Sequence, residues 1–298
     1  MIQVYGLGQC TLDHLAILPS YPKPDTKCEF REMTVQGGGP AATAIVALSR
    51  WGISCAFAGV VGDDSFGVEI KRSLDHEGVD TKGLLVRPGC GSQFAFIAVE
   101  AGTGKRTIFW RHPSGAPPSP NELDHDLIRS AKVFHTDGLF IEASLAAART
   151  ARAGGAQIVV DAGTLREGSL ELAKHSDCFI ASANFGRALI GDDRPLEACR
   201  RLAELGPRVV GITLGERGYV AMDRGVVIER PAYRVQAVDT TGCGDVFHGG
   251  FIYGLLQGWD TVTSLDFGAW AAARVSLGLG GRAAIPSLAD WPDRNFPA

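Results

Sequence analysis

The sequence lacks the features that accompany membrane spans and nucleic-acid binding. No apolar run approaches the roughly 18 residues that a transmembrane helix needs, and Met1–Gly6 has the pattern of a core strand rather than of a signal peptide. The formal net charge is −4, and no basic cluster is interleaved with aromatic residues. We therefore expect a cytoplasmic protein that has neither a membrane nor a nucleic acid as its partner.

Cysteine is sparse and unpatterned. The seven cysteines are odd in number and form no C-x-x-C pair, which argues against both disulfides and a zinc site. The seven histidines show no metal-ligand spacing, so the metal ligands stay unknown at this point. Because 45% of the 298 residues are hydrophobic, the chain can bury a substantial core, and we expect one domain over residues 1–298.

Short apolar runs alternate with helix-length segments through most of the chain, as in an α/β fold with a mainly parallel sheet. Two regions depart from this alternation, at about residues 11–35 and 83–112. They contain short strand-like runs and a hairpin turn at Ala101–Lys105. We predict that these two regions form a small β-sheet that stands off the core as a lid.

The stretch Asp239–Asp245 precedes an apolar, helix-length segment and contains two glycines around Cys243. A glycine-rich turn that opens a helix directs several backbone N–H groups toward one point, where they bind anions. Asp245 would lie beside that anion, and an anion cradle with an adjacent base suits phosphoryl transfer to a hydroxyl. The alternative is an ordinary helix start in which Asp245 is only the N-cap.

A second helix start has the same character. Gly37, Gly38 and Gly39 precede Pro40, so its backbone donors are free of side chains. Asp13 lies just past the first strand, where open α/β sheets bind ligands. The alternatives are tight helix–sheet packing and a solvated loop acid.

Together these segments resemble the ribokinase-like (PfkB-type) carbohydrate kinases over nearly the whole chain. Gly37–Ala44 with Gly59–Asp64 is similar to the first family signature, and Asp239–Gly249 is similar to the highly specific second one. The forms of Gly37–Ala44 and Gly280–Pro286 are most similar to the branch that includes sulfofructose kinase.

The resemblance implies a three-layer αβα core, ATP as donor, Mg²⁺ as metal and a homodimer formed through the lid. It leaves a monovalent-cation requirement open. It implies that Asp245 is the general base, beside an anion hole made by the amides of Gly242, Cys243 and Gly244. The residues implied to bind sugar hydroxyls are Asp13, Gly38 and Gly39, and those implied to line the nucleotide site are Thr213, Gly215 and Gly218.

Three positions depart from the family pattern. Thr43 stands nearest to the usual sugar-binding asparagine, and Cys243 replaces an alanine. The N-x-x-E element, which is tied to Mg²⁺ and phosphate, becomes Asn184-Phe185-Gly186-Arg187, with an arginine in place of the glutamate. We therefore expect metal handling to differ in detail.

The sequence predicts an ATP-dependent kinase of a small sugar or sugar derivative. A narrower hypothesis gives Lys27 and Arg111, both on the predicted lid, the recognition of an anionic substrate group, because an arginine fork binds such groups bidentately. One alternative is a nucleoside kinase with an apolar slot near Phe94, Phe96 or Trp110. The other is a binding protein that keeps the fold without catalysis.

Overall fold

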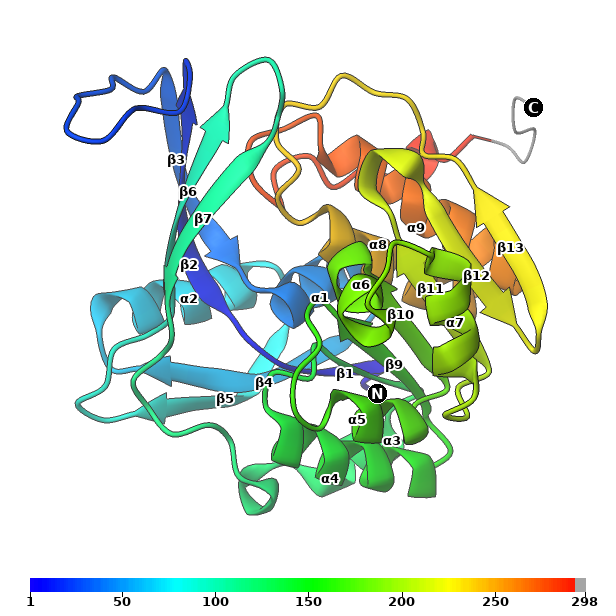
Figure 1. Ribbon diagram of the computed structural model, residues 1–298. Helices are drawn as coiled ribbons and strands as arrows, with labels where there is room; N and C mark the ends of the chain where they lie inside the picture. The colour runs from blue at the N-terminus through cyan, green and yellow to red at the C-terminus, as the bar shows by residue number, and fades with distance from the viewer. Residues whose placement is uncertain (293–298) are drawn as a thin grey trace.

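A nine-stranded sheet forms the centre of the computed structural model, which describes residues 1–292 (Figure 1). Its strand order is β13-β12-β11-β10-β9-β8-β1-β4-β5, and every neighbouring pair is parallel except β11–β12 and β12–β13, because β12 runs in the opposite direction. The strands are β1 Val4–Leu7, β4 Cys55–Gly62, β5 Asp80–Arg87, β8 Val133–Thr136, β9 Gln157–Ala162, β10 Cys178–Ser182, β11 Val209–Thr213, β12 Tyr219–Asp223 and β13 Val226–Arg230. The central strands β1, β4 and β8 are buried throughout, because helices cover both faces of the sheet.

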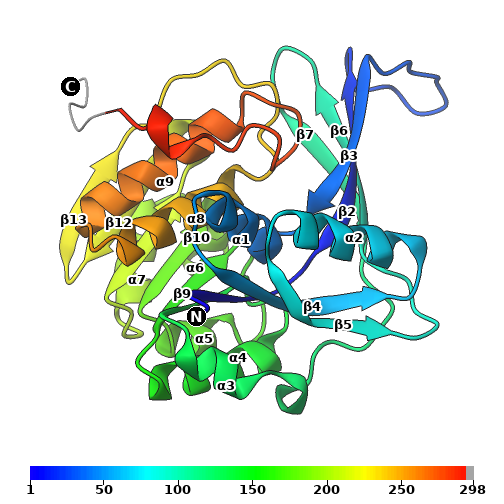
Figure 2. The ribbon, with the colours of Figure 1, turned by 180° about the vertical axis from the view of Figure 1, so that it is seen from behind.

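The helices form two layers, which confirms the expected αβα arrangement (Figure 2). One layer holds α1 Pro40–Arg50, α2 Ser65–His76, α8 Cys243–Leu256 and α9 Thr261–Val275. The other holds α3 His125–Ser130, α4 Ile141–Ala153, α5 Ser169–Lys174, α6 Ala183–Ile190 and α7 Pro195–Ala203. Short 3₁₀ turns occur at Pro120–Glu122, Gly215–Arg217 and Leu288–Asp290. Within residues 1–292 we find no helix with the length and hydrophobicity to cross a bilayer.

A separate four-stranded sheet has the order β3-β2-β6-β7 and stands beside the core (Figure 1). Its strands are β2 Thr11–Leu18, β3 Glu32–Gly38, β6 Phe94–Glu100 and β7 Arg106–Arg111. The predicted boundary of this sheet was wrong at one point. Residues 83–87 belong to β5, which pairs in parallel with β4 in the large sheet. The helix α2 lies between β4 and β5, so the three form a crossover unit that returns to the same sheet.

Close packing between α1 and α8 brings their N-termini together. A Cβ atom on Gly249 would lie 3.0 Å from the Ala44 carbonyl oxygen, and one on Gly250 would lie 2.7 Å from the Gly268 Cα atom. Side chains at these two glycines would therefore force α8 away from α1 and α9. Both glycine-rich turns predicted from the sequence consequently open at the same edge of the sheet.

Candidate active site

A pocket of about 500 Å³ lies between the small sheet and the carboxyl edge of the large sheet. This volume lies in the range of small-molecule sites. The polar side chains that line it come from the ends of β1, β2, β8, β9 and β11, from the small sheet, and from the start of α8. They include Gln9, Asp13, Gln93, Arg106, Asp137, Asp161, Arg166, Thr213, Asp245 and His248.

The start of α8 is built as an anion cradle. Gly242 is its N-cap residue, adopts the left-handed conformation with φ 76°, and would collide with Gly281 if it carried a Cβ. No side chain caps this helix start, and space is open around Gly244. The backbone N–H groups of Gly242 and Gly244 are thus left for a ligand, whereas that of Cys243 makes a long hydrogen bond of 3.4 Å to the Thr240 carbonyl. Cys243 follows between these two glycines, and burial raises the pKa of its thiol to about 12, so it stays neutral.

Asp245 lies in the first turn of α8 and lines the pocket, so it is not the N-cap that the alternative interpretation required. Loss of solvent raises the pKa of its carboxyl group to about 7, and the neighbouring charge of Asp161 adds to this rise. His248 and Arg106 act in the opposite direction. A carboxylate whose pKa lies near neutrality has the proton affinity that a general base needs.

Asp13, which lines the pocket, lies against Gly38, which does not. A Cβ on Gly38 would collide with the Asp13 carboxylate, so only glycine allows this approach. Asp13 is 6% exposed, and its Oδ1 atom has no hydrogen-bond partner in the protein. Burial raises its pKa to about 6, while the charge of Arg282 lowers it. An unpaired buried acceptor facing a pocket fits a ligand hydroxyl donor. Gly39, the N-cap of α1, also lines the pocket.

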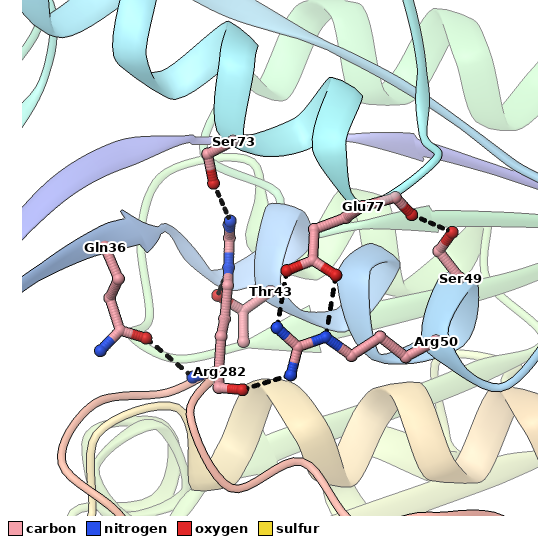
Figure 3. Close-up of polar contacts among 7 residues, drawn as sticks. All are labelled: Gln36, Thr43, Ser49, Arg50, Ser73, Glu77 and Arg282. Atoms are coloured by element: carbon pink, nitrogen blue, oxygen red, sulfur yellow. Dashed lines mark hydrogen bonds and ion pairs between the residues drawn. The ribbon is translucent and has the colours of Figure 1, made fainter.

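Thr43 does not line the pocket and is 2% exposed. Its hydroxyl accepts a hydrogen bond of 3.3 Å from Nε of Arg282, as Figure 3 shows. The predicted sugar contact at Thr43 therefore has no geometric support in the structure. A small hydroxyl replaces the family's longer asparagine, and the buried guanidinium of Arg282 occupies the adjoining space.

Arg282 connects the C-terminal loop to the base of the small sheet. Its guanidinium also donates to the Gly38 carbonyl and to Ser73 Oγ, at 3.1 Å each. Its own backbone N–H donates to Gln36 Oε1, and its carbonyl accepts a bond from Arg50 (Figure 3). Arg282 thus fixes the glycine turn on which Asp13 packs.

The predicted anion contacts Lys27 and Arg111 lie outside the pocket lining. Lys27 is in the long connection between β2 and β3, and Arg111 reaches toward Gly91 and Asp64. The alternation of side chains along β7 explains why Arg111 is outside the pocket. Arg106, Ile108 and Trp110 face the pocket, and Arg111 therefore faces away.

Arg106 and Arg166 are the arginines that do line the pocket. Nη1 of Arg106 donates a 2.6 Å hydrogen bond to Thr240 Oγ1, which joins the small sheet to the segment before the anion cradle. Trp110 also lines the pocket, whereas Phe94 and Phe96 pack instead on Phe66 and Phe109. The apolar slot of the nucleoside-kinase alternative is therefore not assembled as expected.

Of the three residues predicted to line the nucleotide site, one lines the pocket and two do not. Thr213 lines the pocket, and its hydroxyl donates to the Ala181 carbonyl at 3.3 Å. Gly215 and Gly218 lie just outside the pocket lining. Space is open at Gly215, but a Cβ on Gly218 would collide with the Arg230 carbonyl, so Gly218 serves close packing.

The glutamate position of the N-x-x-E element is occupied by Arg187, whose side chain is ion-paired. Nη2 of Arg187 donates to Asn184 Oδ1 at 2.5 Å, and Nη1 lies 3.5 Å from Asp193. Among residues 1–292 there is no group of three or more acidic, cysteine or histidine side chains that could hold a metal ion. A Mg²⁺ ion bound with a nucleotide needs only one or two carboxylates besides the phosphates, and the uncapped start of α8 fits such a phosphate group.

Asp137, at the end of β8, was not among the predicted site residues. Its carboxylate accepts hydrogen bonds from the backbone N–H groups of Gln9 at 2.8 Å and Leu139 at 3.1 Å. Burial raises its pKa to about 7. The available sequence signal was an acid directly after a buried strand, the same pattern that pointed to Asp13.

These features define a class of protein. The mostly parallel large sheet lies between two helix layers, and a second sheet stands beside its carboxyl edge. Two glycine-led helix starts meet an acid in one pocket. This is the architecture of a ribokinase-like sugar kinase.

Comparisons with known proteins agree with this class. Residues 1–288 match the model of the pfkB family carbohydrate kinases. The chain is 28% identical over 294 residues to the ribokinase of Haemophilus influenzae, covering 94% of both chains. It is 34% identical over 230 residues to the fructokinase of Solanum tuberosum, covering 72% of this chain and 70% of the fructokinase. The protein therefore belongs to the pfkB family and is a carbohydrate kinase.

Solved structures confirm the fold. The ribokinase of Thermotoga maritima superposes with a TM-score of 0.82 at 23% identity, covering 96% of this chain and 97% of the ribokinase. A protein of E. coli that is provisionally assigned as ribokinase II, solved in complex with ATP and Mg²⁺, gives a TM-score of 0.83 at 21% identity and covers 97% of both chains.

Proposed function

We propose that this kinase transfers the γ-phosphoryl group of ATP to a hydroxyl of a small anionic sugar derivative, with Asp245 as general base. The observation that carries the proposal is the position of Asp245 beside the uncapped start of α8 in one pocket. The acceptor hydroxyl would donate its proton to Asp245 while its oxygen attacks phosphorus in line with the leaving ADP oxygen.

The amides of Gly242, Cys243 and Gly244 would donate hydrogen bonds to the transferring group, because Gly242 and Gly244 line the pocket at a helix start that no side chain caps. Mg²⁺, when bound with ATP, would offset the charge of the phosphate oxygens. Thr213 would lie along the nucleotide. Asp13 and Gly39, which line the same pocket, would hold hydroxyls of the sugar.

An anionic acceptor is favoured by the two arginines that line the pocket. Arg106 and Arg166 are exposed there and have no carboxylate partner among the described residues. Apart from the Arg106 bond to Thr240, their N–H groups are therefore available to a carboxylate, sulfonate or phosphate of the substrate. These residues take over the role that the sequence assigned to Lys27 and Arg111.

The outer face of the small sheet supports the proposed homodimer. Met33 and Val35 of β3 and Phe109 of β7 are each 45–48% exposed, and their cross-strand registers place them on the side opposite Asp13. Apolar patches of this kind are common at protein interfaces. A cytoplasmic location and membership of the sulfofructose kinase branch stay predictions, and the monovalent-cation requirement stays open.

An ADP-release assay with Mg·ATP and a panel of neutral sugars, sugar acids, sulfo-sugars and nucleosides would test the proposal. We expect an anionic sugar to turn over best. Asp245→Asn should lower its turnover by about 10²–10⁴-fold, which is what a general base contributes. Asp126→Asn, an exposed change on α3, is the matched control. Unchanged turnover in Asp245→Asn would contradict the mechanism.

A further inference from the structure

His248 lies on α8 one helical turn after Asp245, and both of its ring nitrogens face carbonyl oxygens. Nδ1 is 2.7 Å from the Gly244 oxygen, and Nε2 is 3.3 Å from the Ile180 oxygen. A carbonyl oxygen only accepts hydrogen bonds, so each contact requires an N–H on the ring. A neutral imidazole has one N–H, and only the imidazolium satisfies both contacts.

A carboxyl group that can supply the counter-charge lies beside this ring. Oδ2 of Asp161, at the carboxyl end of β9, lies 3.4 Å from Nδ1 of His248, and the two side chains are only 11% and 3% exposed. Burial raises the pKa of Asp161, and the charge of His248 lowers it. An unpaired charge at such depth would be costly, whereas a hydrogen-bonded ion pair is tolerated.

The neighbouring His135 behaves differently. Its ring stacks at 6.1 Å from that of His248, and its Nδ1 lies 3.1 Å from the Val159 oxygen. Its Nε2 has no partner in the protein, as fits a neutral ring. Burial and then the charge of His248 lower the pKa of His135 to about 3, so the pair of rings carries one charge.

We propose that His248 is held as an imidazolium against Asp161 and is a positioning residue for the anion cradle and for Asp245. Its ring fixes the Gly244 carbonyl and thereby the turn whose amides face the phosphoryl group. Its charge favours the ionised form of Asp245. The second effect rests on the proposed function of Asp245 as base.

The charges around Asp245 explain how the His248–Asp161 pair affects the ionisation of Asp245. Asp161 on β9 and Asp13 on β2 raise the pKa of Asp245, while His248 on α8 and Arg106 on β7 lower it, and His135 on β8 is neutral. Without His248, nothing opposes the burial that raises the pKa of Asp161, and ionisation of either Asp161 or Asp245 then opposes ionisation of the other. A nearby opposite charge lowers a carboxyl pKa by about one to three units.

The pH dependence of kcat/KM tests this inference. In His248→Gln we expect the acid limb to move up by about one pH unit, which is a tenfold loss of rate below the limb. Adding Asp161→Asn to His248→Gln should move the limb back, because the opposing anion is removed. His76→Gln, an exposed change at the end of α2, should leave the profile unchanged. A slower His248→Gln enzyme with an unmoved limb, or a double variant without recovery, would overturn the proposal.

Nitrogen NMR of the ¹⁵N-labelled wild-type protein gives a readout that needs no activity. Comparison with His248→Gln assigns the signals, and both ring nitrogens of His248 should be protonated at pH 7. A single neutral tautomer near pH 7 would overturn the proposal. If no sugar is turned over, the proposed function fails, but this spectrum still decides the charge of His248.

Discussion

Replacing Arg282 should weaken both the fold and sugar binding. Its guanidinium donates three hydrogen bonds, to the Gly38 carbonyl at 3.1 Å, Ser73 Oγ at 3.1 Å and Thr43 Oγ1 at 3.3 Å. The side chain is almost fully buried, and burial lowers its pKa to about 10, so it is still charged at neutral pH.

The magnitude follows from these contacts. At these lengths each bond contributes about 1 kcal/mol, and Arg282→Ala leaves the Gly38 carbonyl and two hydroxyls without a partner, so we expect a loss of about 3–5 kcal/mol. In a chain of this size that is a fall in Tm of roughly 5–10 °C. The Asp13 carboxyl also loses the charge that lowers its pKa, which is already about 6. More of it is then protonated at pH 7, and the KM for the sugar should rise about tenfold and recover at higher pH.

Differential scanning calorimetry and steady-state kinetics at two pH values measure both effects. Arg50→Ala is the matched control, because Arg50 contacts the Arg282 carbonyl and Glu77 while lying 34% exposed at the edge of the same network. Its cost should stay near 1 kcal/mol, as for other exposed ion pairs. A stability change below about 1 kcal/mol in Arg282→Ala, together with an unchanged sugar KM, would refute the reasoning.

Three further outcomes are expected. The kcat/KM of the wild-type enzyme should fall below about pH 7, because the pKa of Asp245 is raised to about 7 and its protonated form accepts no proton; a flat profile down to pH 5 would contradict this assignment. At a pH well above the acid limb, where losing the Arg106 charge does not change the ionisation of Asp245, Arg106→Gln should lower kcat/KM for the best anionic sugar by about 10–100-fold and for neutral sugars by much less, as the loss of a charged hydrogen bond predicts; an equal loss for both would remove the anion contact. Phe109→Lys on the outer face of the small sheet should shift the protein from dimer to monomer in light-scattering measurements, and a wild-type protein that is already monomeric would contradict the proposed homodimer.

Local chemistry explains why much of this molecule was predictable. The starts of α1 and α8 depend on glycines whose conformation is required where they stand, such as Gly39 at φ 95° and Gly242 at φ 76°. Alternation of strand and helix patterns then implies a parallel sheet without knowledge of distant contacts. The fold and the placement of Asp245 in the pocket follow from patterns of this kind.

The site predictions without geometric support concern residues whose position depends on long-range packing or on strand register. Thr43 and Arg282 are 239 residues apart in sequence, and nothing local to either indicates a buried guanidinium. Arg111 was predicted from its place on the small sheet and its bidentate fork, without regard to which face of the strand it occupies. The alternation of β7, in which Ile108 and Trp110 face the pocket together with Arg106, would have reversed that choice.

The loop at residues 278–284 contacts both glycine-led helix starts. Gly281 packs against Gly242 at the anion cradle, where a Cβ atom on Gly242 would collide with the Gly281 Cα atom. The next residue, Arg282, donates to the carbonyl of Gly38, the residue against which Asp13 packs. Adjacent residues of one segment therefore contact the cradle and the turn that we propose to bind the sugar. In-line transfer needs the acceptor hydroxyl and the phosphoryl group held at a set separation, and under the proposed function this shared segment would help to set it.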